Sequence, residues 1–237
     1  MSKIGIVQPG RIGDIIIVLP IAKYYFDKGY EVFWPVVNQY LDLFEYVDYV
    51  HPVPVGNFQN NALRGSYQIS LRKLKKLGIN EIIDLGIGFG RDREEWESSG
   101  LSFDEWKYRE ANVPFDLKYK LEIKRNKAKE EELRVRVAST HLNRKLSHSN
   151  GFSAGSYIFP VDDLVEIISI EGFTLFDWIP IIEQAKELYC IDSAVANLAN
   201  ALDLCVGKRY FRAHGDNWPD WLKPLLTPKM KEDWVWI

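Results

Sequence analysis

The first half of the chain alternates short apolar runs with longer amphipathic stretches. Each apolar run is bounded by turn or polar residues, as is typical of strands buried in a sheet. The two amphipathic stretches, 14–27 and 69–78, predict helices that end before Gly29 and at Gly78. This alternation predicts a parallel sheet with helices on both faces. The apolar runs lie at residues 3–7, 31–37, 48–53 and 81–86.

The alternation restarts after a charged stretch at residues 123–133, which we interpret as a solvated connector or an exposed helix. The chain is therefore expected to divide into an N-terminal domain, 1–128, and a C-terminal domain, 129–237. Residues 86–115 are interpreted as a loop or helical excursion over a cleft. In the second half, strands are predicted at residues 134–139, 164–169, 188–192 and 208–213, a polar loop at 140–151, and helices at 174–187 and 193–202.

The composition restricts the classes of function. The chain has 237 residues, 46% of them hydrophobic, which suffices for one large core or two small ones. A net charge of only −3 gives no general attraction to nucleic acid, so no nucleic-acid partner is expected. Cys190 and Cys205 lie in apolar runs and are interpreted as reduced core thiols. The N-terminal stretch lacks a signal-peptide pattern, and the longest apolar run is too short to span a bilayer. We therefore expect a soluble, cytoplasmic protein.

The sequence QPGRIGD at residues 8–14 forms the first of two strand–helix junctions with candidate chemistry. Ligands of open parallel sheets bind beyond the carboxyl ends of the strands. The junction lacks the G-x-G-x-x-G spacing of a dinucleotide site, and the second strand ends without an acidic residue. A nicotinamide-dependent oxidoreductase or epimerase is therefore disfavoured. Gly10 and Gly13 permit a tight turn, and Asp14 suits either a helix cap or a functional carboxylate.

The sequence CIDSAVAN at residues 190–197 forms the second junction. Ser193 and Ala194 begin a helix directly after a buried strand. Backbone N–H groups and the dipole at such a helix start favour an anion, and small residues allow a phosphate to approach. Arg144 and Lys145, in the predicted loop, could neutralise the same phosphates. The alternative is an ordinary N-cap serine and a solvated basic pair.

The two junctions together resemble a known family. The pattern GRIGD, followed six residues later by proline, resembles the N-terminal motif of the heptosyltransferases, glycosyltransferase family 9. The stretch TLFDWIPIIEQAKELYCIDSAVANLANALDL resembles that family's donor-site signature of a helix, a strand ending in D-S/T-G, and a second helix. The resemblance implies the GT-B form of α/β fold, two Rossmann-like domains facing across a cleft. The N-terminal domain would hold the acceptor, and the aromatic C-terminal tail would pack back on it.

The resemblance also implies roles for individual residues. Asp14 falls on the proposed catalytic base, and Gly10, Arg11 and Gly13 form the acceptor-side loop. The implied donor-binding residues are Thr140, Arg144, Lys145, Phe173, Asp192, Ser193, Ala194 and Asn197.

Within that donor set, Arg144 would meet the diphosphate, Thr140 would supply a hydroxyl, and Phe173 would line the nucleobase pocket. The chain departs from the family at Ala194, where glycine is usual, and at Asn197, where histidine is frequent. The identity of the sugar, the nucleobase and the acceptor is left open.

The implied reaction is an inverting transfer of a sugar from a nucleotide-sugar donor to a glycan or glycolipid acceptor. A carboxylate base takes the proton of the acceptor hydroxyl, and fixed cations and a helix N-terminus stabilise the leaving diphosphate. We expect no metal and no cofactor, since the histidines lack ligand spacing and the nucleotide-sugar is a substrate. A peripheral membrane contact through the acceptor stays open. The alternative function is a non-catalytic nucleotide- or sugar-binding relative of the GT-B fold.

Overall fold

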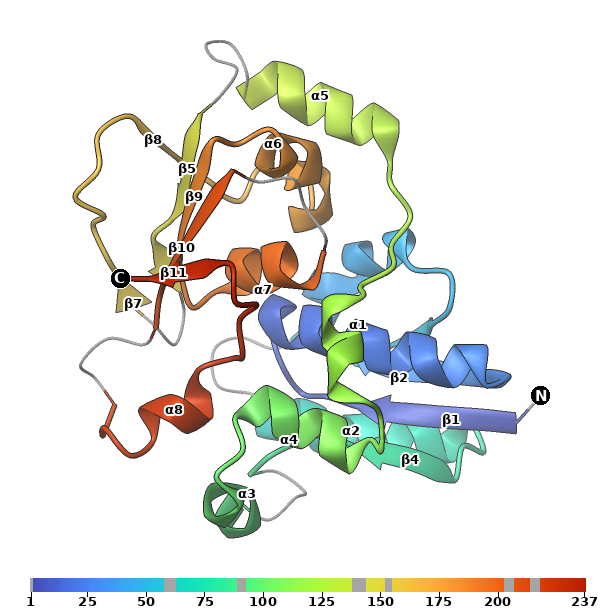
Figure 1. Cartoon of the computed structure of the whole chain (residues 1–237). Helices are drawn as coiled ribbons and strands as arrows, with labels where there is room; N and C mark the ends of the chain where they lie inside the picture. Colours follow the sequence, from blue (N-terminus) through green and yellow to red (C-terminus); the bar gives the residue numbers. More distant parts are fainter. Residues whose placement is uncertain are drawn as a thin grey trace. The chain divides into compact units, whose positions relative to one another are not determined.

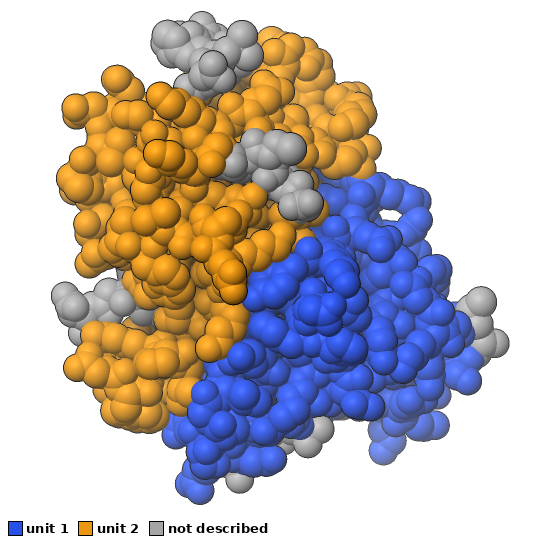
Figure 2. All heavy atoms as spheres, in the orientation of Figure 1, with its two compact units in different colours: residues 1–124 blue, residues 125–237 orange. Residues whose placement is uncertain are grey.

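Two compact units make up the chain, Met1–Lys124 and Arg125–Ile237 (Figure 2). The sequence predicted the division a few residues later, after residue 128. No helix in the described part of the chain is long and apolar enough to cross a membrane. The computed structural model describes residues 2–57, 63–88, 93–137, 144–151, 155–202, 207–213 and 218–237.

The first unit is built on a parallel sheet in the order β3-β2-β1-β4. The sequence predicted all four strands to within three residues. Because β2 and β4 flank β1 on opposite sides, the carboxyl ends of β1 and β4 border the switch point at which such sheets bind ligands. The strands are β1 (Ser2–Val7), β2 (Tyr30–Val36), β3 (His51–Pro54) and β4 (Glu81–Asp84).

Helices cover this sheet and follow its strands. Helix α2 packs closely on β1, because a Cβ atom at Gly5 would overlap the buried Leu74 side chain. Helix α1 follows β1 and packs beside β2, α4 and η2. Two short helices, α3 and α4, lie within the segment at 86–115 that was predicted to be a loop or helical excursion. The helices are α1 (Ile12–Asp27), η1 (Asn38–Tyr46), α2 (Leu63–Lys76), α3 (Arg93–Ser99), α4 (Phe103–Glu110) and η2 (Phe115–Tyr119).

The second unit has a five-stranded parallel sheet in the order β11-β10-β9-β5-β8 (Figure 1). Its switch point lies between β5 and β9, since the chain goes from β5 to β8 on one side and to β9 on the other. The last strand, β11, adds the end of the aromatic tail to this sheet. The strands are β5 (Lys145–His148), β8 (Leu164–Glu166), β9 (Glu187–Ile191), β10 (Lys208–Arg212) and β11 (Trp234–Trp236), with a hairpin of β6 (Asn150–Gly151) and β7 (Gly155–Ser156).

The remaining elements of this unit are helices. Thr174 caps η3, since its Oγ1 accepts from the Phe176 N–H at 3.2 Å and Asp177 completes the capping box. The predicted helix at 174–187 is shorter, ending at Glu183. The helices are α5 (Lys127–Val137), η3 (Leu175–Trp178), α6 (Ile179–Glu183), α7 (Ala194–Ala201) and α8 (Lys223–Leu226).

One predicted strand is wrong. Described residues of the stretch at 134–139 belong to the end of α5, and the strand lies instead within the predicted loop, as β5. Alternating Arg and Val residues imitate a strand, but Val135 is 65% exposed and Arg134 pairs with Glu131 one helical turn away. The buried face of α5 is set by Glu130 and Leu133.

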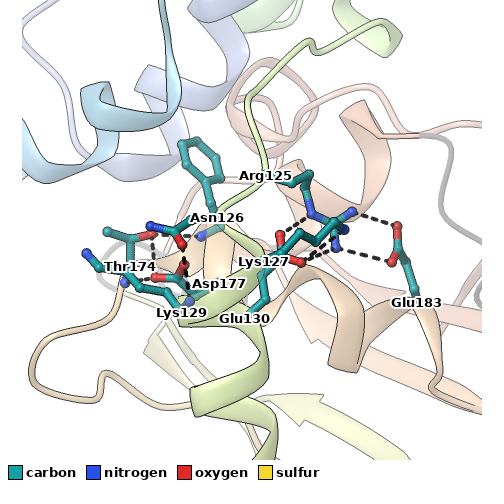
Figure 3. A network of polar contacts seen from close by, with 9 residues as sticks. Arg125, Asn126, Lys127, Lys129, Glu130, Thr174, Asp177 and Glu183 are labelled. Atoms are coloured by element: carbon teal, nitrogen blue, oxygen red, sulfur yellow. Dashed lines mark hydrogen bonds and ion pairs between the residues drawn. The ribbon is translucent and has the colours of Figure 1, made fainter.

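An ion-pair network ties α5 to α6 within the second unit (Figure 3). The guanidinium of Arg125 bonds to both carboxylate oxygens of Glu130 and, at 3.1 Å, to Glu183. Asn126 begins the helix, with its Oδ1 accepting from the Lys129 N–H at 3.2 Å. The charged connector is therefore a largely exposed helix, the second of the two interpretations, and paired charges fix its start.

Candidate functional site

Asp14 lies in the first turn of α1, immediately beyond the carboxyl end of β1. The helix begins at Ile12, so Asp14 is its third residue. The predicted helix start at residue 14 placed Asp14 at the cap, but the N-cap is Arg11. Its Oδ2 accepts a hydrogen bond from the backbone N–H of Arg11 at 3.2 Å. The carboxylate thus satisfies one of the free donors of the helix start, where negative charge is favoured by the helix dipole.

Lys107, on α4, forms an ion pair with the other carboxylate oxygen of Asp14. The two partners differ in exposure: the Lys107 side chain is 4% exposed and the Asp14 side chain 31%. The Lys107 ammonium also lies 5.0 Å from the ring centre of Phe103. Both oxygens of Asp14 are therefore oriented by fixed donors, while solvent still reaches the carboxylate.

The position of Lys107 is fixed by the anchoring of α4. At the start of α4, the Ser102 N–H donates to the Glu105 carboxylate at 3.0 Å. In the first turn, the fully buried Asp104 pairs with the buried Lys118 of η2 at 2.5 Å. Lys107 is not among the predicted site residues. The serine–glutamate spacing of a capping box is a signal that could have located α4, although not its partner.

Gly10 lacks a side chain at a point where Asp14 packs against the backbone. A Cβ atom at position 10 would overlap the Cβ and carboxylate of Asp14. The Gly10 N–H donates to the Gln8 carbonyl at 2.9 Å, which closes a tight turn at the end of β1. Arg11 and Gly13 lie on either side of the helix start. The residues predicted to form the acceptor-side loop therefore make up the turn against which the Asp14 side chain packs.

In the second unit, Asp192 and Ser193 follow β9 and begin α7. The Ser193 Oγ accepts from the Ala196 N–H at 3.4 Å, as an N-cap does, and the Asn197 amide donates to the Ser193 carbonyl at 3.1 Å. Asp192, Ser193 and Asn197 are all at least nine-tenths buried. The amides of Ala194 and the next residue occupy the first helical positions, which have no partner within a helix.

Arg144 and Lys145 do not join this group. Lys145 is the first residue of β5 and pairs in register with Glu187, the first residue of β9. Asp192 lies five residues beyond Glu187, or roughly 16 Å along the strand direction at about 3.3 Å per residue. Arg144 precedes Lys145 and donates to the Val137 carbonyl at 3.2 Å. The predicted phosphate cations therefore lie at the amino edge of the sheet, opposite the anion-favouring helix start.

The remaining predicted donor contacts are Phe173 and Thr140. The Phe173 ring has the Arg136 guanidinium of α5 at 5.8 Å from its centre. Thr140 lies outside the described residues.

Three side chains that are not among the predicted site residues lie at the carboxyl edge. His148 ends β5, Glu166 ends β8 and accepts from the Ser149 N–H at 2.7 Å, and Arg212 ends β10. Arg212 is in register with Ile191, and its carbonyl accepts from the Asp192 N–H at 3.0 Å. Its guanidinium lies 3.9 Å from the ring centre of Tyr157. The backbone of Arg212 therefore lies level with Asp192, which precedes the N-cap of α7, while its guanidinium stacks on Tyr157.

Burial lowers the pKa of the His148 imidazole, against a smaller opposing effect of Glu166. Its Nδ1 finds no hydrogen-bond partner among the described residues. Burial also raises the pKa of the neighbouring Cys190 thiol, consistent with a reduced core cysteine. In the described part of the chain, no three His, Cys, Asp or Glu residues gather as a metal-binding group would require.

Solved structures of glycosyltransferases share this architecture. A family 9 glycosyl transferase from Veillonella parvula aligns over 100% of this chain and 85% of its own, with a TM-score of 0.59 and 10% identity. ADP-heptose LPS heptosyltransferase II of E. coli aligns over 100% and 90%, with a TM-score of 0.59 and 11% identity. The chain has a heptosyltransferase-like fold. The resemblance inferred from the two junctions is thereby confirmed at the level of the fold.

A third neighbour is the iron-containing dodecameric glycosyltransferase TibC of enterotoxigenic E. coli, with a TM-score of 0.53 and 9% identity over 93% of this chain and 61% of its own. No protein-family model and no curated protein sequence matches this chain. At such low identities the likeness concerns the fold alone. The expected independence of metal stays a prediction, as do the cleft between the domains and the packing of the tail on the N-terminal domain.

Proposed function

We propose that this chain is an inverting glycosyltransferase that moves a sugar from a nucleotide-sugar to a hydroxyl of a glycan or glycolipid acceptor. The observation that carries the proposal is the Asp14 carboxylate. It stands beyond the carboxyl end of β1, on a heptosyltransferase-like fold, with one oxygen held by Lys107 and the other by the Arg11 N–H. A carboxylate oriented in this way and open to solvent is suited to act as a general base.

The chemistry assigned to Asp14 is a single displacement. The acceptor oxygen attacks the anomeric carbon of the donor, and the bond from that carbon to the diphosphate oxygen breaks. The hydroxyl proton passes to the Asp14 carboxylate, and the nucleoside diphosphate leaves with the electron pair. A carboxylate has about four lone-pair sites, so the two recorded contacts leave room for the acceptor hydroxyl.

On the donor side, the proposal places the diphosphate at the start of α7. Ser193 and Ala194 present backbone N–H groups there, and the helix dipole favours the negative charge. Arg212 replaces Arg144 as the proposed cation, because Arg212 ends β10 at the level of Asp192. A guanidinium fixed beside the leaving group would stabilise the charge that develops as the glycosidic bond breaks.

The alternative, a non-catalytic binder of nucleotides or sugars, is favoured by one observation. The Ser193 hydroxyl is already engaged as an ordinary N-cap. A panel of nucleotide-sugars tests both functions in two steps. A donor present at 100 times its dissociation constant should add about 2.7 kcal/mol to the free energy of unfolding, visible as a rise in melting temperature. Release of nucleoside diphosphate from that donor, accelerated by acceptor glycans, supports the transferase. Binding without release supports the alternative, and no stabilisation by any nucleotide or nucleotide-sugar contradicts both.

A further inference from the structure

A small pocket lies in the first unit at the carboxyl ends of β1, β2 and β3. Its walls include Gln8 and Gly10 after β1, Trp34 of β2, Tyr40 of η1 and Ser70 of α2. The space open to the centres of water-sized spheres is about 10 Å³. That is room for one water molecule or one hydroxyl group. The pocket is therefore suited to part of a ligand, not to a whole sugar ring.

Gln8, one of the lining residues, carries a buried hydrogen-bond acceptor that lacks a partner among the described residues. The residue is 8% exposed, and its side-chain oxygen, Oε1, has no hydrogen-bond donor within the described residues. Leaving a buried polar atom unpaired costs about 1–3 kcal/mol. A ligand that brings an O–H or N–H group to Gln8 would recover that energy.

The remaining walls exclude charge and favour an amphipathic ligand. None of the twelve residues that line the pocket is charged. Trp34 is buried and Tyr40 half-buried, so aromatic surface lies beside the amide of Gln8. Burial of an unpaired ionised group against such walls would be strongly unfavourable. The chemistry that fits is an uncharged hydroxyl group carried on an apolar carbon frame, which describes the edge of a neutral sugar.

The pocket also adjoins the candidate base. Gly10 forms part of its wall and touches the Asp14 side chain so closely that a Cβ atom there would overlap the carboxylate. We propose that the Gln8 pocket binds a hydroxyl or hydroxymethyl group of an uncharged sugar and thereby selects a neutral acceptor. The acceptor role rests on the proposed function. The binding of the sugar does not, because it needs neither donor nor turnover.

Ligand-observed NMR on the full chain, without nucleotide, tests this proposal. The probes are the methyl pyranosides of glucose, galactose and mannose, together with the corresponding methyl uronates. At least one neutral glycoside should bind, and its uronate should bind at least tenfold more weakly. Gln8→Met keeps the approximate volume but removes the acceptor, so binding should weaken by about tenfold. Gln68→Met, the same change at an exposed position of α2, should leave binding unchanged.

Three results would overturn the proposal. They are binding of no neutral glycoside, equal binding of uronates, and equal loss of binding in Gln8→Met and Gln68→Met. If Gln8→Met does not fold, Tyr40→Ala at the half-exposed wall provides the second variant, and unchanged binding there counts against the pocket. Sugar binding without any nucleotide effect would support the pocket while contradicting the transferase, so the two failures can be told apart.

Discussion

Asp14 and Lys107 form an ion pair, and removing one partner should destabilise the protein more than removing the other. Asp14→Asn leaves a lysine ammonium that is almost fully buried, whereas Lys107→Met leaves a carboxylate that solvent reaches. We expect Asp14→Asn to lower the free energy of unfolding by up to about 3 kcal/mol, and Lys107→Met to lower it less. The double variant Asp14→Asn/Lys107→Met should be more stable than Asp14→Asn alone. Urea unfolding of the four proteins measures this cycle, and additive effects would contradict a coupled pair.

His148 should make stability depend on pH in the weakly acid range. Burial lowers the pKa of its imidazole in the folded state, so below the ordinary value of 6.5 the unfolded chain binds a proton that the native protein does not. The free energy of unfolding should therefore fall as pH decreases through 6.5, by at most about 1.4 kcal/mol per pH unit from this group. His148→Gln should remove this contribution, and His51→Gln, at an exposed strand position, should not. Parallel curves for wild type and His148→Gln would contradict the assignment.

Some residues of the candidate site could be identified from the sequence, and others could not. Asp14 is visible because glycines, a strand and a helix start surround it within a few residues. Lys107 lies 93 residues away in the chain, and only the packing of α4 beside α1 brings the two together. Gln8 was passed over for a related reason, because its unpaired oxygen becomes a signal only when its burial is known.

Most strands could be predicted from the sequence. One was misplaced, and this changed which basic residues could reach the phosphates. Buried strands such as β1 and β9 can be recognised in the sequence as apolar runs with polar ends. The β5 strand has the sequence KLSH, too short and too polar to stand out beside the alternating Arg and Val residues of α5. That shift moved Arg144 and Lys145 from a loop at the ligand edge to the opposite edge of the sheet.

Two arginines at opposite ends of the same sheet therefore give a matched comparison. Arg212→Gln should weaken binding of a nucleoside diphosphate by roughly 10- to 100-fold, the loss expected for a charge-assisted hydrogen bond, and should affect the bare nucleoside much less. Arg144→Gln should leave both affinities near wild type, because it lies at the amino edge. Calorimetric titration of both ligands into both variants is the measurement. If Arg144→Gln weakens binding of the diphosphate as much as Arg212→Gln does, the phosphate site lies near Arg144, as first predicted.

In the whole molecule, the predicted division into two αβ halves corresponds to two units, each with its own parallel sheet. The chain passes between them at Lys124 and Arg125, and both residues are anchored. The Lys124 N–H donates to the Tyr46 carbonyl at 2.8 Å in the first unit, and Arg125 pairs with Glu130 and Glu183 in the second. The prediction of this division came from the alternation of strands and helices, which restarts after the charged stretch.

The most direct test of the central claim, that Asp14 takes the proton of the acceptor during sugar transfer, is the turnover of two variants that share Lys107→Met. Both lack the buried ammonium, so neither carries the unpaired charge that would complicate Asp14→Asn alone. With donor and acceptor saturating, Lys107→Met should retain transfer, while Asp14→Asn/Lys107→Met should transfer sugar roughly 10²–10⁴-fold more slowly with donor affinity unchanged. Equal turnover of the two variants would contradict the account and leave Asp14 as a residue that only stabilises the start of its helix.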